Sequence, residues 1–423
     1  MTDIVVIGAG AAGFLAAITA ARAGASVMLL EKMPYPGKKL LITGKGRCNL
    51  TNDCSHEELI RNLPGNGRFL HSAFKQFSVE DIMRFFEQEG VPLKVERGQR
   101  VFPVSDKAGD IVACLGRTAH KAGVVLKTSS PVTKILVDSG RIVGVEVNHK
   151  EQIACQMVIL ATGGSSYPGT GTTGDGYRMA KELGHHITPL KPSLVPFECN
   201  YPNLQDLMGS SLKNVEASLY QDDKSVQKEF GELLITHFGL SGPIILTLSR
   251  RYNELSLTAP KAQYSIRINL KPALSAEQLD KRLQRDFQEF QRKQLKNALN
   301  ELLPQKLILP IILAAGLPPD HFIHDLTRAE RLALRQTLQD WRFPIKGTRP
   351  LVEAIVTAGG VAVTEVNPKT MASKKVAGLF VVGETLDVDG FTGGFNLQAA
   401  FSSGYVAGKY AAEQLQANTQ GVE

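Results

Sequence analysis

The hydrophobic pattern at the start of the chain predicts a strand, a helix and a second strand in close succession. Residues 3–7 (DIVVI) form a short apolar, β-branched run, which is typical of a parallel strand buried on both faces. A stretch of small apolar residues, 14–24, follows and predicts a helix that ends at Gly24. Residues 26–30 (SVMLL) predict the next strand. This order indicates a strand–helix–strand unit with a parallel sheet.

The same kind of buried strand recurs much later in the chain. Residues 131–160 predict a β-meander, and its last strand, 156–160, ends on the small residues ATGG. Residues 378–382 (GLFVV) predict another buried strand, and a helix of small residues is expected from about 397 to 412. Strands this far apart in the chain predict one discontinuous sheet domain.

Between about residues 193 and 344 this pattern disappears. Residues 195–270 hold short apolar runs, with 243–249 (PIILTLS) among them, that predict the strands of a small barrel or sheet. Residues 275–341 follow a helical period. We therefore predict an α/β fold in which a discontinuous Rossmann-like domain is interrupted by a β-rich, barrel-like region and a helical region. The Rossmann-like domain is expected in residues 1–192 and 345–423, the β-rich region in 193–272 and the helical region in 273–344.

Composition narrows the class of protein further. Of the 423 residues, 43% are hydrophobic and 21% are charged, which excludes wholesale disorder and a disulfide-stapled miniprotein. The longest strongly apolar stretch, 307–317, is too short to cross a membrane and carries Pro310. The chain enters its first strand within three residues, which leaves no room for an export signal. Together with five irregularly spaced cysteines, these features predict a cytoplasmic protein without membrane contact.

The net charge and the spacing of Cys and His residues say little more about the class of protein. Lys and Arg number 48 against 41 Asp and Glu, and the net charge of +7 permits contact with nucleic acid or an anionic ligand without requiring it. Basic residues between 281 and 296 alternate with acids, which is typical of a solvated helix face; a face toward RNA is the alternative. No CxxC, HxxxH or HExxH spacing occurs, so no metal site is predicted. The sequence predicts no particular oligomeric state.

The first motif that carries chemistry is the glycine-rich turn after the first strand. Gly8, Gly10 and Gly13 form a GxGxxG between a strand and a helix, and Glu31 ends the second strand. Gly8 allows the tight turn, Gly10 lets a pyrophosphate approach the backbone, and Gly13 lets the helix pack on the strand. The helix N-terminus would hold the phosphates, and Glu31 would accept hydrogen bonds from a ribose. A purely structural turn is the alternative, and the motif alone does not separate NAD from FAD.

The segment after the second strand differs from an ordinary crossover helix. A Gly-Lys-Gly turn at 44–46 is followed by hydrogen-bond donors on Arg47 and Asn49, so this loop suits a flat, electron-rich ligand. In flavoproteins with two dinucleotide-binding domains, the corresponding loop lies against the isoalloxazine ring. Disulfide reductases of that class have a redox CxxxxC in this loop, whereas Cys48 and Cys54 have five residues between them. We therefore predict that Cys48 packs near the flavin, with a redox dithiol as the alternative.

Motifs at the ends of the later strands complete the prediction of a cofactor. ATGG at 161–164 and GE at 383–384 follow the glycine-rich turn in the order expected of one discontinuous FAD domain. The closing helix would point its N-terminus at the flavin edge, where negative charge gathers on reduction. We therefore predict FAD as the cofactor. The predicted cofactor-binding residues are Gly8, Gly10, Ala12, Gly13, Glu31, Lys32, Lys39, Gly44, Gly46, Arg47, Asn49, Val132, Thr162, Gly163, Gly383, Glu384, Asp387, Asn396 and Leu397.

These stretches resemble the BaiN/RdsA family of NAD(P)/FAD-dependent oxidoreductases, and the resemblance covers essentially the whole chain. Its most specific parts are GKKLLITGKGRCNLTN (37–52), RVFPVSDKA (100–108), GELLITHFGLSGPIILTLS (231–249) and GLFVVGETLDVDGFTGGFNLQAAFSSG (378–404). The resemblance implies an FAD domain with a β-rich and helical insertion. It places Arg47 and Asn49 in the flavin loop and Glu384, Asp387 and Asn396 in the C-terminal flavin site. Lys45 departs from the pattern, since many relatives have glycine there.

The resemblance also implies the kind of reaction. Members with assigned activities reduce carbon–carbon double bonds, either in a bile-acid enone or in a uridine of large-subunit ribosomal RNA. NAD(P)H would reduce the flavin, the flavin would pass a hydride to a polarised double bond, and an acid would protonate the neighbouring carbon. No second GxGxxG occurs, so the nicotinamide would visit transiently. His237 and Cys48 are the predicted proton donors, with Ser241 as a hydrogen-bonding partner; a structural role for His237 is the alternative.

Three functions stay open at this point. The first is an FAD-dependent double-bond reductase that acts on a small molecule or on RNA. The second is an FAD oxidase or dehydrogenase of a small amine or acid, in which reduced flavin would react rapidly with oxygen. The third is a flavin-containing RNA-binding factor with little turnover, whose RNA binding would depend strongly on salt.

Overall fold

The computed structural model describes residues 2–420, and these divide into two compact units. The first unit combines the chain up to Pro192 with the chain from Leu351 onward, and the second unit is Ser193–Pro350. Each unit has its own hydrophobic core. None of the helices within residues 2–420 has the length and apolar content that a membrane span requires.

The first unit is built around five parallel strands, β1 (Ile4–Ile7), β2 (Val27–Leu30), β6 (Val125–Lys127), β10 (Met157–Leu160) and β19 (Leu379–Val381). They form one sheet in the order β19-β10-β1-β2-β6. Every residue of β1, β10 and β19 is buried, as expected for apolar strands covered on both faces. Ile4 pairs with Met157 on one side and with Val27 on the other, so β1 lies at the middle of the sheet.

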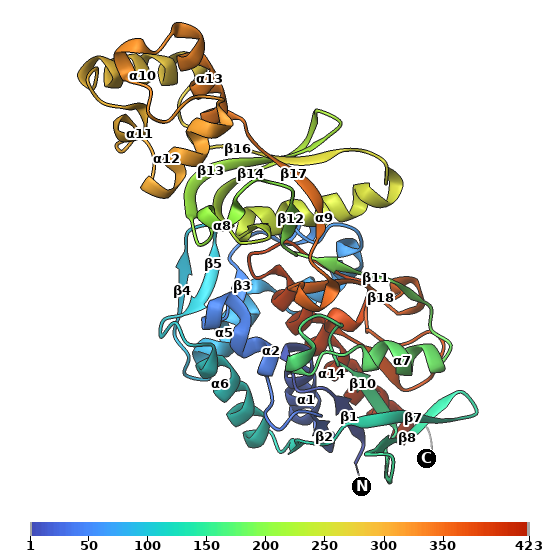
Figure 1. Cartoon of the computed structure of the whole chain (residues 1–423). Coiled ribbons are helices and arrows are strands. Elements are labelled where there is room, and N and C mark those ends of the chain that lie inside the picture. Colours follow the sequence, from blue (N-terminus) through green and yellow to red (C-terminus); the bar gives the residue numbers. More distant parts are fainter. Residues whose placement is uncertain (1, 421–423) are drawn as a thin grey trace. The chain divides into compact units, whose positions relative to one another are not determined.

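Two helices, α1 (Ala11–Arg22) and α14 (Phe395–Gln420), pack closely against each other beside this sheet (Figure 1). A Cβ atom at Gly404 would lie 2.2 Å from the Ala12 carbonyl oxygen, and one at Gly408 would lie 2.2 Å from that of Ala16. Only glycine permits this approach. Because 404 and 408 match 12 and 16 in order, the two helices run in the same direction. Both N-termini therefore point toward the carboxyl ends of the strands, and α14 begins roughly 12 Å earlier along that direction than α1.

Smaller elements surround this core. The short helices are α2 (Lys38–Ile42), α3 (His56–Arg61), α4 (His71–Gln76), α5 (Val79–Gln88), α6 (Ala108–Lys121) and α7 (Asp175–Glu182). The remaining strands are β3 (Thr51–Asn52), β4 (Leu93–Glu96), β5 (Arg100–Pro103), β7 (Val132–Asp138), β8 (Arg141–Val147), β9 (Glu151–Ala154), β11 (Ile187–Ser193) and β18 (Val356–Val361). The predicted meander is only partly correct. β7, β8 and β9 form an antiparallel sheet, whereas the strand expected at 156–160 joins the parallel sheet as β10, because its uninterrupted apolar run is buried on both faces.

The second unit contains a closed barrel of six strands. These are β12 (Phe197–Cys199), β13 (Ser211–Gln221), β14 (Lys224–Ile235), β15 (Gly239–Ser241), β16 (Tyr264–Asn269) and β17 (Trp341–Thr348), in the order β12-β15-β14-β13-β16-β17. The fully buried Trp341 and Phe343 help to fill its core, and the Trp341 indole donates a 2.8 Å hydrogen bond to the Tyr201 hydroxyl. The predicted α/β class with a barrel-like and helical insertion is confirmed.

The strand predicted at 243–249 is wrong, because these residues form the first half of α9 (Pro243–Thr258). A short, mostly apolar run of seven residues does not distinguish a buried strand from a buried helix. The turn residues before it do point to a helix, since Gly242 has φ of 95° and Pro243 occupies the first helical position.

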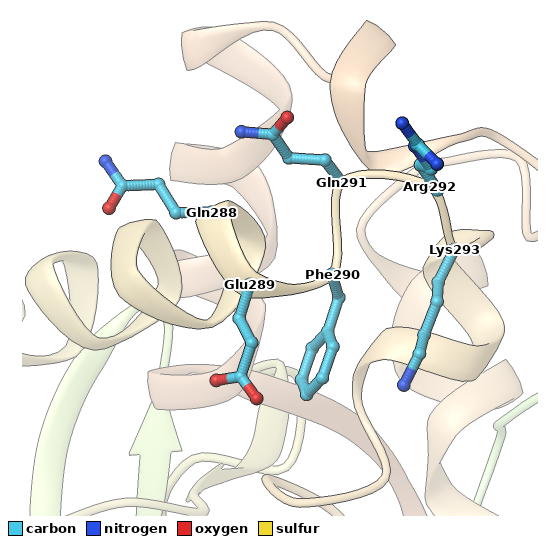
Figure 2. A pocket seen from close by; sticks show the side chains of 6 residues that line it. All are labelled: Gln288, Glu289, Phe290, Gln291, Arg292 and Lys293. Atoms are coloured by element: carbon cyan, nitrogen blue, oxygen red, sulfur yellow. The ribbon is translucent and has the colours of Figure 1, made fainter.

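The helical part of the second unit contains α10 (Ala276–Glu289), α11 (Leu295–Ala298), α12 (Gln305–Ala314) and α13 (Arg328–Gln339), and α8 (Leu204–Leu207) lies beside α12. The helical pattern predicted for 275–341 is broken after Glu289, where Leu295 N–H donates to the His321 carbonyl at 2.8 Å instead of continuing a helix. Figure 2 shows the end of α10 and the turn that follows, with the side chains of 288–293 as sticks. These residues line an open hollow of about 310 Å³. None of the predicted site residues lines this hollow.

A buried histidine, His185, links two segments of the first unit through hydrogen bonds. The His185 ring lies 3.0 Å from the Glu365 carboxylate through Nδ1 and 2.9 Å from the Ser373 hydroxyl through Nε2. This resembles a hydrolytic triad, but Ser373 Oγ already accepts hydrogen bonds from the backbone N–H groups of Lys375 and Val376, so its lone pairs are occupied. The arrangement therefore fixes the loop that carries Ser373.

We expect this contact to weaken below neutral pH. Burial lowers the pKa of His185 below its ordinary value of 6.5, so the unfolded chain takes up a proton more readily than the folded one. The free energy of unfolding should be constant above about pH 7 and fall toward pH 5, by at most about 1.4 kcal/mol per pH unit. His185→Gln should flatten this slope in urea titrations, and His120→Gln, at an exposed position, should not. Equal slopes in the parent and in His185→Gln would contradict the assignment.

Candidate cofactor site

The sheet order creates a crevice at the carboxyl end of β1. From β1 the sheet continues through β2 and β6 on one side and through β10 and β19 on the other. In open parallel sheets, ligands bind outside the strand ends where the order reverses in this way. The segments that leave the strands at this edge begin with Gly8, Glu31, Ala161 and Val382. Four sequence motifs far apart in the chain therefore meet at one edge.

The glycine-rich turn after β1 is tightly packed on one side and open on the other. Gly8 has φ of +101°, and a Cβ atom there would lie 2.6 Å from the Ala161 carbonyl oxygen. A Cβ atom at Gly13 would lie 1.8 Å from the Gly8 carbonyl oxygen, whereas one at Gly10 would meet no atom within 4 Å. Gly10 is the N-cap of α1, and no side chain caps that helix end. Free backbone N–H groups and the positive end of the helix dipole therefore face open space, as a phosphate site requires.

The acid at the end of β2 is held by this turn. One oxygen of the Glu31 carboxylate accepts a 2.9 Å hydrogen bond from Ala9 N–H, and the other accepts one of 2.8 Å from Met33 N–H. These bonds leave further lone pairs free for a ligand hydroxyl. The neighbouring Lys32 points elsewhere, since its Nζ lies 2.6 Å from the Asp175 carboxylate at the start of α7.

The loops after β10 and β19 lie side by side. Thr162 Oγ1 and Thr385 Oγ1 are 3.5 Å apart, and Gly163 has φ of +73°. Gly383 has φ of +63°, and a Cβ atom there would lie 3.1 Å from the Ala12 side chain of α1. The next residue, Glu384, forms a 2.7 Å ion pair with Lys39. The predicted residues of these two loops are thus brought together with α1.

The loop after α2 has an unusual backbone. Gly44, Lys45, Gly46 and Cys48 all have positive φ, between 56° and 85°. For lysine and cysteine this conformation is strained, and such strain is often found at functional sites. Asn49 follows, and its Oδ1 is buried without a hydrogen-bond partner within the described part of the chain. A buried acceptor of this kind fits an N–H donor supplied by a ligand.

Arg47 does not extend toward the crevice as a free donor. Its guanidinium donates to the Glu96 carboxylate and, at 2.7 Å, to Asp106, and it lies 4.1 Å from the centre of the Phe102 ring. The hydrogen bond from Arg47 lowers the pKa of Glu96. The charge of Arg47 is therefore compensated by its own chain, and the residue anchors the strained loop to β4 and β5.

The remaining predicted cofactor-binding residues have mixed surroundings. The Asn396 side chain is occupied by hydrogen bonds of 2.8 and 2.9 Å with the backbone of Gly390, so it shapes the turn before α14. Leu397 lies partly buried in the first turn of α14, and Val132 is buried at the start of β7. The carboxylate of Asp387 accepts no hydrogen bond from any residue in the described part of the chain.

The three predicted catalytic residues lie in different units. Cys48 belongs to the first unit and is fully buried. His237 and Ser241 belong to the second unit, where His237 is exposed in the turn between β14 and β15 and Ser241 ends β15 at partial exposure. Their catalytic assignment stays a prediction.

The cysteines are predicted to be chemically inert. All five are free, and burial raises the pKa of the Cys48 thiol to about 11 and that of Cys54 to about 11 as well. Both thiols are therefore protonated and poor nucleophiles at neutral pH. We expect native protein to react with a chromogenic disulfide reagent at least about 100-fold more slowly than unfolded protein. The flavin of a Cys48→Ala/Cys54→Ala double variant should be reduced by NAD(P)H at the parent rate. Slower reduction of the flavin in this variant would support the redox dithiol instead.

Several residues of this site escaped the sequence prediction. Ser166 and Thr357 are buried beside Glu384, and the buried Gln398 of α14 accepts a 2.6 Å hydrogen bond from Thr51. Gln398 is the single polar residue within the stretch 397–401, and this local pattern is a signal that could have identified it. Within residues 2–420 no cluster of three or more His, Cys, Asp or Glu side chains could hold a metal ion.

Comparison with known proteins agrees with this geometry. The model of the family described as HI0933-like protein Rossmann domain matches residues 2–410. The chain is 32% identical over 403 residues to the ribosomal RNA dihydrouridine synthase of Escherichia coli, with 95% of this chain and 96% of that protein covered. It is 31% identical to the 3-dehydro-bile acid delta(4,6)-reductase of Clostridium scindens, with 98% and 100% covered. A flavocytochrome c3 fumarate reductase structure has a TM-score of 0.52 at 19% identity, covers 97% of this chain and 78% of its own, and supports the fold alone.

Proposed function

Since this chain belongs to the HI0933-like Rossmann family and is an FAD-dependent oxidoreductase, we propose that it uses NAD(P)H to reduce a polarised carbon–carbon double bond. The observation that carries this proposal is that two relatives matched over nearly their whole length are both named for such a reduction. One acts on a base in ribosomal RNA and the other on a bile acid. An enone or a uracil ring is accordingly the acceptor class that we propose.

The residues of the crevice support FAD as the cofactor. We propose that residues 1–192 and 345–423 form the FAD-binding domain, with the pyrophosphate in the open space above Gly10 at the N-terminus of α1. Glu31 is placed to accept a ribose hydroxyl, and Asn49 Oδ1 to accept an N–H group of the flavin ring. FAD, once bound, supplies the hydride that the acceptor receives. The chain itself must orient the acceptor and deliver a proton.

For the proton we favour His237 over Cys48. The Cys48 thiol is fully buried and its pKa is raised to about 11, so it is inaccessible to a substrate carbon and holds its proton strongly. The His237 ring is exposed and packs edge-on against Phe238, with ring centres 5.0 Å apart. Histidine is the side chain most often used to transfer a proton in catalysis, and an exposed ring is accessible to a substrate. Ser241 is the proposed hydrogen-bonding partner of the acceptor.

The structure gives little support to an extended RNA-binding face on the helical region. Arg282 and Arg285 both pair with Asp286, at 2.9 and 3.1 Å, and Lys296 pairs with Asp320. Paired cations have less charge to offer to phosphates. We therefore propose RNA only as the carrier of a uracil acceptor, and a small enone is the alternative substrate.

The test is the reoxidation of reduced enzyme without oxygen. Enzyme reduced by NADH or NADPH is mixed with an enone or with uridine-containing ribosomal RNA, and the flavin absorbance is followed. In two separate arms, the reduced enzyme is mixed with oxygen, and the oxidised enzyme is mixed with an amine or acid without oxygen. Rapid reoxidation by an enone or by RNA supports the reductase. Reoxidation by oxygen alone, together with flavin reduction by an amine or acid, would identify an oxidase instead. For the RNA arm, dihydrouridine is measured by mass spectrometry in ribosomal RNA from cells with and without the gene.

A further inference from the structure

We propose that the Lys39–Glu384 ion pair is a positioning device for the cofactor loops, and that Asp387 is the acid that meets the hydroxyl groups of the cofactor. This inference rests on the FAD site proposed above. It reverses the expectation for Glu384, which the motif placed in direct contact with the cofactor. It also gives a role to three residues outside the predicted cofactor-binding set, Ser166, Tyr177 and Thr357.

The carboxylate of Glu384 is already occupied by its own chain. One oxygen accepts a 2.7 Å hydrogen bond from Lys39 Nζ, and the other accepts one of 2.8 Å from Thr357 N–H. The buried Ser166 hydroxyl lies 3.4 Å from the second oxygen and 2.9 Å from Lys39 Nζ. A carboxylate has about four lone-pair positions, and three contacts already use this one, so Glu384 has less capacity left for a ligand than Glu31, which has two.

Neighbouring atoms also leave the Glu384 side chain little free space. A Cβ atom at Gly164 would lie 2.8 Å from Glu384 Oε1 and 2.5 Å from the Thr357 hydroxyl. Only 19% of the Glu384 side chain and 24% of the Lys39 side chain remain exposed. Breaking a partly buried pair leaves one charge uncompensated, so turning Glu384 toward a ligand hydroxyl would cost more than the new hydrogen bond returns.

The pair joins the segments that surround the crevice. Lys39 comes from α2, Ser166 from the loop after β10, and Thr357 from β18. The Tyr177 hydroxyl of α7 donates a 2.9 Å hydrogen bond to the Glu384 carbonyl oxygen. The ion pair and the Glu384 backbone thus connect α2, the loop after β10, β18 and α7 to the loop after β19, next to Gly383, which itself packs against α1. Its effect on binding would be to hold these loops at the spacing that the dinucleotide requires.

The carboxylate of Asp387, unlike that of Glu384, has no partner within residues 2–420. Its backbone is fixed, because its N–H donates to the Val361 carbonyl at 3.0 Å and its carbonyl accepts from the Asn66 amide at 2.8 Å. Its side chain is partly exposed, and its carboxylate accepts no hydrogen bond within residues 2–420. A rigid backbone with a free carboxylate is what recognition of a sugar or ribityl hydroxyl needs.

The experiment is a double-mutant cycle on the dissociation constant of FAD, measured by titrating apoprotein and following flavin fluorescence. Lys39→Met and Glu384→Gln should each weaken binding about 10-fold, and the double variant should also be about 10-fold weaker, because both changes remove one interaction. Asp387→Asn should weaken binding about 10-fold, and combining it with Lys39→Met should give about 100-fold, because the two sites act independently. Lys39→Arg, which keeps the cation, should restore binding to within about threefold of the parent.

Other outcomes would overturn the proposal. If Lys39→Met and Glu384→Gln multiply to about 100-fold, each residue contacts the cofactor by itself. The proposal also fails if Asp387→Asn or Lys39→Met alone binds FAD within about twofold of the parent. Where Glu384→Gln does not fold, as judged by melting of the apoprotein, parental FAD binding by Lys39→Met still overturns the proposal, and so does a loss well above about threefold in Lys39→Arg. Failure of the parent to bind FAD at all would instead refute the proposed function.

Discussion

Gly10→Glu is expected to abolish FAD binding while the apoprotein stays nearly as stable as the parent. Gly10 has an ordinary extended backbone, with φ of −93°, and a Cβ atom there meets no other atom within 4 Å. Any side chain can therefore be accommodated in the absence of ligand, at a cost of about 1 kcal/mol or less for the altered helix cap. A carboxylate would fill the space reserved for the pyrophosphate and repel its charge. Like charges in contact cost several kcal/mol, so affinity should fall by at least about 100-fold.

Two neighbouring substitutions serve as controls for Gly10→Glu. Gly10→Ala adds only one methyl group to the open space and should weaken FAD binding far less than glutamate does. Gly13→Ala should behave in the opposite way, because its Cβ atom would lie 1.8 Å from the Gly8 carbonyl oxygen. Such an overlap forces the helix away from the turn and should destabilise the fold by about 3 kcal/mol or more.

These variants are compared by urea unfolding of the apoprotein and by titration with FAD. If Gly10→Glu binds FAD with parental affinity, the pyrophosphate does not lie above Gly10. If it unfolds as readily as Gly13→Ala, the open space above Gly10 is not present in the protein. Gly10 and Gly13 are only three positions apart in the same turn. Substitutions at Gly10 test the space for the ligand, and the substitution at Gly13 tests the packing of the turn.

Four of the five strands of the parallel sheet could be predicted from the sequence because each is a local apolar run, whereas β6 was not predicted and β10 was expected in the meander. Uninterrupted apolar runs predicted β1, β2, β10 and β19, and the glycines of the turn after β1 predicted where the chain must turn and pack. The strands far apart in the chain meet because parallel strands share one carboxyl edge. The misassigned segment at 243–249 has a run of apolar residues that fits either state, so only tertiary packing decides it.

The partners of charged side chains could not be predicted in the same way. Arg47 was assigned to the cofactor loop, yet Glu96 and Asp106, about fifty residues further on, hold its guanidinium. Lys39 and Glu384 are 345 residues apart. Such pairs depend on how loops meet in three dimensions, and a long flexible side chain carries no local pattern that indicates its partner. The position of a residue in a motif therefore predicts where the residue lies in the fold better than it predicts which side chain it pairs with.

His237→Gln is expected to slow reduction of the acceptor by about 100-fold or more, the usual contribution of a positioned acid. The substitution keeps the size and hydrogen-bonding character of the side chain but removes its transferable proton. Reduction of the flavin by NAD(P)H involves no such acid and should proceed at the parent rate. The two half-reactions are measured separately by rapid mixing without oxygen, so that a loss confined to the second one identifies proton delivery.

Controls in both units make this result specific. His324→Gln alters another exposed histidine of the second unit and should leave both half-reactions unchanged. Cys48→Ala should have little effect on proton delivery, because the buried thiol, with its pKa raised to about 11, is a poor acid and is inaccessible to substrate. Parental acceptor reduction in His237→Gln would exclude His237 as the acid. If acceptor reduction were instead much slower in Cys48→Ala with FAD still bound, Cys48 would be the proton donor. The thiol would then have to become accessible during the reaction.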